Sequence, residues 1–187
     1  MSDRMKVKIV QSLTGAVVLT LLMQVFVLTG YTQYIWMLFL PLLMFFALGA
    51  DLKKIPSMII CYVCGIAWAY ANGILQEVFR SFASEAVVGI VPTIIIIFLI
   101  LTIHEGFLAK TILGNIPCLF LGMATTFFVF MIGVPLTPIH LIAFYLYGIV
   151  LTIVLVFAGM TVCSAIFGKE RAMKAIIGEF PGHDKND

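Results

Sequence analysis

The feature that most constrains this chain is a succession of long apolar runs. Apart from Glu105 near the end of the fourth, none of these runs contains Asp, Glu, Lys or Arg; they cover residues 9–29, 33–50, 56–76, 86–107, 113–133 and 139–167. A helix needs about 20 apolar residues to cross the hydrocarbon core of a bilayer. The runs are continuous and lack the alternation of a transmembrane β-barrel. The sequence therefore predicts an all-α polytopic membrane protein with six transmembrane helices.

The composition agrees with this interpretation. Hydrophobic residues make up 63% of the chain and charged residues only 11%, and the mean hydropathy is +1.16. A soluble domain carries about a quarter charged residues, so this chain has too few charges to cover a surface in water. All four cysteines lie inside apolar runs, which argues against a secreted disulfide framework. No small-residue cleavage site follows the basic N-terminus, so we expect a retained span rather than a signal peptide.

The positive charges predict the orientation of the spans. With six spans both termini lie on one side, and that side receives every Lys and Arg except Arg80. Loops rich in Lys and Arg remain cytoplasmic, so both termini should be cytoplasmic. The expected organisation is a cytoplasmic N-terminus over residues 1–8, a six-helix transmembrane domain over 9–167 and a cytoplasmic tail over 168–187.

The first, third and fifth spans begin alike, with KIVQSLTG at 8–15, KIPSMIICYVCG at 54–65 and NIPCLFLGMATT at 115–126. This similarity predicts three helical hairpins of the same orientation, arranged around a pseudo-threefold centre. Transport proteins built from internal repeats often place the substrate site at the repeat interface.

Each of these three spans presents small or mildly polar residues at helical spacing, which puts them on one face. We call this set the small-residue stripe: Gln11, Gly15, Ser57, Cys61, Cys64, Gly65, Trp68, Asn72, Cys118, Gly122, Thr125 and Thr126. Two interpretations stay open. Small residues let helix backbones approach closely, so the stripe is a packing seam in the first. In the second, three such faces line a narrow path for a solute.

Reactive chemistry at the stripe is disfavoured. Cys61 and Cys64 lie more than a turn inside a span, whereas a redox Cys-x-x-Cys pair sits at a solvent-accessible helix N-terminus. A tetrahedral metal site needs further ligands, and only Cys118 lies at comparable depth. We expect no metal and no cofactor.

His104 and Glu105, at the cytoplasmic end of the fourth span, form a candidate gate because histidine titrates near neutrality. The alternative is that this pair only caps the helix at the membrane interface. No Lys, Arg, Asp or Glu lies deeper in a span, which argues against ion-coupled transport. No catalytic or nucleotide-binding motif is present, so we expect neither an enzyme nor a nucleic-acid-binding protein.

Three short elements resemble a known family: Phe46-Ala47 before the second loop, the Gly-x-x-Trp-Ala element from Gly65 to Ala69, and the Pro-x-x-x-x-Gly start of the fifth span from Pro117 to Gly122. Together they are similar to the YcdZ-like bacterial inner-membrane proteins, a family with a domain of unknown function. The resemblance implies a location in the bacterial cytoplasmic membrane and carries no catalytic residues.

These observations favour a passive channel or facilitator for a small neutral solute, with a path between the first, third and fifth helices. Selectivity would then come from pore width and from hydroxyl, thiol and carbonyl groups. The alternative is a non-transporting membrane subunit or scaffold that uses its small-residue faces for association. The expected partners are the lipid bilayer, the solute and further copies of the chain in a homo-oligomer.

Overall fold

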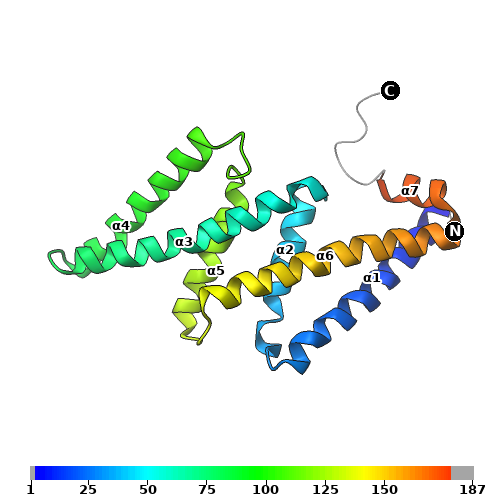
Figure 1. Cartoon of the computed structure of the whole chain (residues 1–187), viewed down its shortest axis with the longest axis horizontal. Helices are drawn as coiled ribbons and strands as arrows, with labels where there is room; N and C mark the ends of the chain where they lie inside the picture. The colour runs from blue at the N-terminus through cyan, green and yellow to red at the C-terminus, as the bar shows by residue number, and fades with distance from the viewer. Residues whose placement is uncertain (1–2, 178–187) are drawn as a thin grey trace. The chain divides into compact units, whose positions relative to one another are not determined.

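The computed structural model describes residues 3–177, and all regular secondary structure within them is helical. Figure 1 shows the α-helices, which are α1 (Asp3–Leu28), α2 (Trp36–Ala47), α3 (Ile55–Arg80), α4 (Glu85–Ile100), α5 (Ile116–Ile132), α6 (Pro138–Phe167) and α7 (Lys169–Ile177). A π-helix, η3 (Leu101–Phe107), continues α4. The end of the predicted tail, residues 178–187, lies outside the described residues.

The all-helical, membrane-type architecture is confirmed. Four helices are long and apolar enough to cross a bilayer: Arg4–Leu28, Leu52–Arg80, Glu85–Phe107 and Pro138–Phe167. Two further apolar helices, α2 with its preceding turn and α5, are shorter. At 1.5 Å per residue the 17 residues of α5 span about 26 Å, somewhat less than the roughly 30 Å hydrocarbon core.

Backbone conformation explains why these two helices are short. The second apolar run extends to residue 50, but α2 ends at Ala47 because Gly49 and Ala50 adopt left-handed φ values of 87° and 54°. A left-handed residue cannot continue a right-handed helix. Gly133, with φ 65°, ends α5 in the same way.

The chain divides into two compact units. One comprises residues 1–52 and 145–187, which hold α1, α2, α7 and most of α6; the other comprises residues 53–144, which hold α3, α4, η3, α5 and the start of α6. Each unit has its own close contacts, described below.

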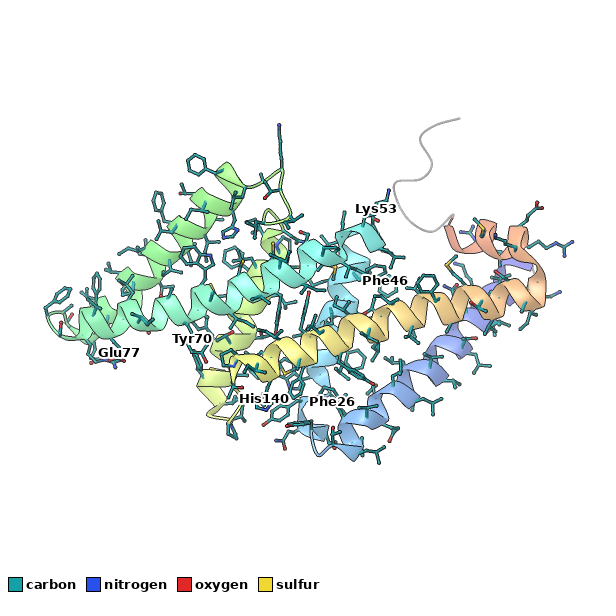
Figure 2. All side chains as sticks on the ribbon, in the orientation of Figure 1. Phe26, Phe46, Lys53, Tyr70, Glu77 and His140 are labelled. Carbon is teal, nitrogen blue, oxygen red and sulfur yellow. The ribbon has the colours of Figure 1, made fainter. Side chains whose placement is uncertain are left out.

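In the unit of residues 53–144, α3 is the central helix and packs against both α4 and α5. A short turn after Arg80 joins α3 to α4, so these two form a hairpin as the sequence predicts for the third and fourth spans (Figure 1). Lys53 precedes α3 and Glu77 lies near its other end, so the charges stand at opposite ends of this span (Figure 2).

In the other unit, α6 packs closely against α2 and α1. A Cβ atom at Gly148 would collide with Pro41 on α2, so only glycine allows this approach. The Tyr147 hydroxyl donates to the Leu22 carbonyl at 2.8 Å, and its ring stacks on Phe26 with 5.7 Å between centroids. These contacts fix α6 to the second half of α1.

Candidate functional site

The small-residue stripe forms a close helix contact where α3 meets α5. A Cβ atom at Gly65 would overlap the Leu119 carbonyl oxygen, and one at Gly122 would overlap the Tyr62 carbonyl oxygen. Each glycine, having no side chain, lets the backbone of the facing helix approach this closely. In this part of the molecule the stripe makes a close packing contact, and a solute path along it stays a prediction.

The polar members of the stripe are satisfied within this contact. Cys118 and Thr126 are fully buried, and the Thr126 hydroxyl donates to the Gly122 carbonyl at 2.8 Å. The Thr125 hydroxyl lies 3.0 Å from the Tyr62 hydroxyl, which links α5 to α3 by a buried hydrogen bond. Such bonds between apolar helices stabilise their packing, because an apolar environment offers these hydroxyls no other partner.

The two cysteines of α3 have different surroundings. Cys61 is fully buried and its thiol donates to the Ile112 carbonyl at 3.3 Å, while Cys64 is half-buried. All four cysteines are free thiols, and the described part of the chain contains no group of three potential metal ligands. Ser57, two residues inside α3, is half-buried.

The two stripe residues on α1 lie against α6 within their own unit. A Cβ atom at Gly15 would lie 3.8 Å from Leu155, and one at Gly159 would lie 3.5 Å from the side chain of Gln11. Both distances are ordinary van der Waals contacts. The path predicted between the first, third and fifth helices stays a prediction.

Trp68 and His104 form a polar contact between α3 and η3. The Trp68 indole N–H donates to His104 Nε2 at 3.1 Å, and His104 Nδ1 lies 2.8 Å from the Leu113 carbonyl oxygen. A carbonyl only accepts and an indole N–H only donates, so Nδ1 carries the hydrogen and the imidazole is neutral. The ring is 5% exposed, which fits a neutral histidine held by two hydrogen bonds.

The neighbouring Glu105 is exposed, and its carboxylate makes no hydrogen bond to His104. Adjacent residues on a helix face different directions. The two members of the predicted gate therefore have different environments, and the partner of His104 is Trp68, another residue singled out by the sequence.

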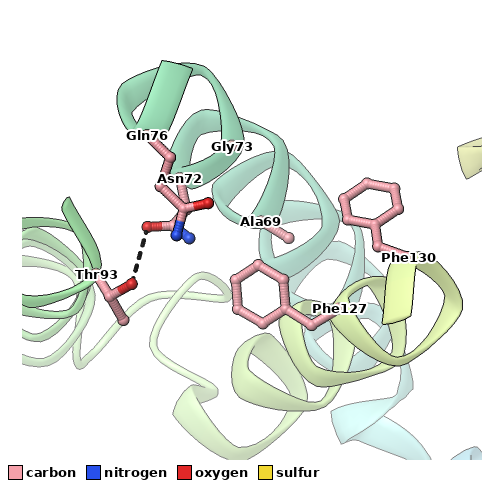
Figure 3. A pocket seen from close by; sticks show the side chains of 7 residues that line it. All are labelled: Ala69, Asn72, Gly73, Gln76, Thr93, Phe127 and Phe130. Carbon is pink, nitrogen blue, oxygen red and sulfur yellow. Dashed lines mark hydrogen bonds between the residues drawn. The ribbon is translucent and has the colours of Figure 1, made fainter. Parts of the chain in front are cut away.

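A pocket of about 370 Å³ lies among α3, α4 and α5, within the range of small-molecule sites. Its lining residues are shown in Figure 3: Ala69, Asn72, Gly73 and Gln76 from α3, Thr93 from α4, and Phe127 and Phe130 from α5. Two amides and a hydroxyl therefore share a pocket with two aromatic rings, and no charged residue lines it.

Asn72 carries an unused hydrogen-bond donor into this pocket. Its Oδ1 accepts from the Thr93 hydroxyl at 3.4 Å, but its Nδ2 has no acceptor among the described residues. Asn72 is only 3% exposed. Among the described residues, every fully enclosed side-chain nitrogen or oxygen has a hydrogen-bond partner, so the unpartnered Nδ2 is not fully enclosed. The amide nitrogen must therefore reach the pocket, where a ligand or water can accept from it.

The Gln76 amide also has no hydrogen-bond partner among the described residues. Gln76 lies four residues after Asn72 on α3, so both amides occupy one face of the helix. Trp68 lies four residues before Asn72 on that same face. The pocket and the Trp68–His104 contact are thus consecutive along α3.

The sequence identified only part of this pocket. Asn72 belongs to the predicted stripe, and Gln76 has a signal in its four-residue spacing from Asn72. Thr93, Phe127 and Phe130 have no such signal, because their role depends on how α4 and α5 pack on α3.

Comparisons with known proteins give one result. A family model described as "Protein of unknown function (DUF1097)" matches residues 12–169, which is most of the chain. No curated protein and no solved structure matches.

Proposed function

The chain belongs to the DUF1097 family of proteins of unknown function, and we propose from its own geometry that it passively conducts a small neutral solute across a membrane. The solute would bind in the pocket of Asn72, Gln76 and Thr93. The observation that carries this proposal is the Asn72 amide nitrogen, which is held in an almost fully buried residue and yet opens to the pocket without a protein acceptor.

The lining of the pocket indicates the class of solute. Primary amides both donate and accept hydrogen bonds, so they suit an uncharged molecule that does the same. The aromatic rings of Phe127 and Phe130 supply apolar walls. A charged solute would lose its hydration without gaining a counter-charge, and that desolvation is costly. Small amides and polyols fit these requirements.

The Trp68–His104 contact supports a closed inner end for this site. Trp68 lies one turn before Asn72 on α3, and its indole N–H is hydrogen-bonded to the neutral His104. A solute leaving the pocket along this face of α3 would have to displace the indole ring. We therefore assign the gating role first predicted for His104 and Glu105 to the pair of Trp68 and His104.

The test is solute flux into liposomes that contain the purified full chain. Stopped-flow swelling would be recorded with urea, formamide, glycerol, ammonia and a short-chain acid. The critical variant is Asn72→Leu, which keeps the volume of the side chain and removes its amide. Loss of one or two hydrogen bonds to the solute, each about 1 kcal/mol, should lower flux about fivefold to thirtyfold.

The matched control is Gln24→Leu, which removes an exposed amide from α1 in the other unit. Flux in this control should equal that of the unaltered chain. Equal flux in Asn72→Leu and the unaltered chain would remove the pocket from the path. Absence of flux for every solute, from folded and inserted protein, would refute the proposed function.

A non-transporting scaffold is the second candidate. The close contact of Gly65 and Gly122 favours it, because there the stripe serves only to bring helices together. The apolar residues Leu13, Val17 and Leu21 along α1 are more than half exposed and would face lipid or another subunit. The absence of flux described above is the result that this candidate predicts.

The finer features expected from the sequence remain part of the proposal. They are six spans in three hairpins around a pseudo-threefold centre, a homo-oligomer, both termini in the cytoplasm, a bacterial inner-membrane location and a YcdZ-like identity within the family. The four long apolar helices support a membrane protein with several spans, and the α3–α4 hairpin supports one of the three hairpins.

A further inference from the structure

The first turns of α1 and the whole of α7 bring positive charges from the two ends of the chain together. Residues 3–8 (DRMKVK) and 169–174 (KERAMK) contain six Lys or Arg residues and two acidic residues. Arg4, Lys6, Lys169 and Arg171 are exposed. We call these four residues the basic cluster.

A buried apolar core holds α7 against α1. Gly168, with φ 84°, ends α6 and reverses the chain, since a left-handed residue stops the helix. Val7 then packs with Cys163, Ala172 and Ala175, with Met160 and Phe167 at the edge of this core. Figure 1 shows α7 beside the start of α1. The Cys163 thiol, 3.7 Å from the Val7 carbonyl oxygen, adds a weak polar contact. The packing of α7 on α1 therefore brings the basic residues of these two helices near one another.

The packing of α7 on α1 is not needed to orient the chain in a membrane. The positive-inside rule needs only Lys and Arg near the end of a span, in any conformation. Here the small residues Ala172 and Ala175 allow α7 to lie directly on α1, while Lys169 and Arg171 remain exposed. Two cationic segments from distant parts of the chain thus lie side by side.

Exposed apolar side chains surround the basic cluster. Met5 is 50% exposed, Ile166 59% and Met173 36%. A helix with charges on one side and exposed apolar residues beside them suits the boundary between headgroups and acyl chains. An acidic partner protein in water would leave these apolar side chains uncovered, so the chemistry favours a lipid surface.

We propose that the basic cluster on α1 and α7 binds the phosphate of an anionic phospholipid, with the lipid's acyl chains beside Met5 and Ile166. Arg4 and Arg171 donate to phosphate oxygens through planar guanidinium groups that can make two parallel hydrogen bonds. Lys6 and Lys169 add charge attraction near the membrane surface. This binding is independent of solute flux through the pocket.

The test is native mass spectrometry of the full chain in detergent, titrated with phosphatidylglycerol or phosphatidylcholine. The unaltered chain should bind phosphatidylglycerol more tightly, and raising the salt concentration should weaken this preference by screening. In the variant Lys169→Gln/Arg171→Gln the preference should fall about fivefold for each cation removed. The control Lys53→Gln/Lys54→Gln removes the same charge from the other unit and should keep the preference.

A second variant tests whether lipid binding depends on the position of the cations or only on their number. Ala172→Asn keeps every cation but puts a larger polar side chain into the buried contact between α7 and α1, so the preference should also fall. Equal binding of the two lipids by the unaltered chain would overturn the proposal. So would an unchanged preference in Lys169→Gln/Arg171→Gln, or inorganic phosphate that competes as strongly as the lipid.

Discussion

The substitution Gly65→Ala tests the α3–α5 contact most directly. The added methyl group would overlap the Leu119 carbonyl oxygen and lie 2.8 Å from the Met123 amide nitrogen. Both are backbone atoms, so no side chain can rotate away and the two helices must separate. Separation also breaks the hydrogen bond between Tyr62 and Thr125.

The expected cost follows from these contacts. Overpacking costs about 1–3 kcal/mol and the lost hydrogen bond about 1 kcal/mol, while alanine recovers up to about 1 kcal/mol of helix propensity. With the full gain in helix propensity subtracted, the net destabilisation should be about 1–3 kcal/mol. Gly73 provides a control on the same helix, because a Cβ atom there has no neighbour within 4 Å. Gly73→Ala should therefore stabilise by about 0.5–1 kcal/mol.

The assay is unfolding of the purified full chain from detergent micelles by increasing dodecyl sulfate, followed by circular dichroism. The measured quantity is the difference in free energy of unfolding between the two alanine variants, expected near 3 kcal/mol from the terms above. If the two variants agree within about 0.5 kcal/mol, the size of an ordinary surface change, then Gly65 does not lie against Leu119 and the reasoning fails.

Two further predictions concern the Trp68–His104 contact and the membrane topology of the chain. Trp68→Phe leaves His104 Nε2 without a donor and should destabilise the protein by about 1–3 kcal/mol in the same unfolding assay. The double variant Trp68→Phe/His104→Leu should recover part of this loss, because no unpaired ring nitrogen remains. If the effects of the two single substitutions simply add in the double variant, the hydrogen bond is contradicted. In a cysteine-free background, Ser81→Cys should react with an impermeant maleimide on intact cells, and Ala109→Cys only after lysis. Labelling of both positions from the same side would refute the orientation of the third and fourth spans.

Much of the fold follows from hydropathy, because apolar length and helix formation are local properties. The fourth run, residues 86–107, corresponds to α4 with η3, and the last run to α6. The second run shows the limit of this reasoning. Its apolar residues extend to position 50, but the left-handed Gly49 and Ala50 shorten α2, and alanine gives no warning of that conformation.

The site depends on contacts that hydropathy cannot show. The spacing of Gly65 and Gly122 predicted a shared helix face, yet a face that packs and a face that lines a path have the same composition. The close approach at Gly65 depends on the backbone of Leu119, which lies 54 residues away along the chain. Asn72 was identified for the same spacing, but its free amide nitrogen became evident only once Thr93 was placed opposite its oxygen.

The π-helix η3 gives the position of His104 an unusual dependence on chain length. In this segment the backbone bonds reach five residues back, as from the Leu108 amide to the Ile103 carbonyl, instead of four. A deletion of one residue among 101–103 would return the segment to α-helical bonding and change the position of His104 relative to Trp68. The span would remain apolar and long enough, so insertion into a membrane would be unaffected. Within this family, the number of residues between Ile100 and His104 should therefore vary less than their identity.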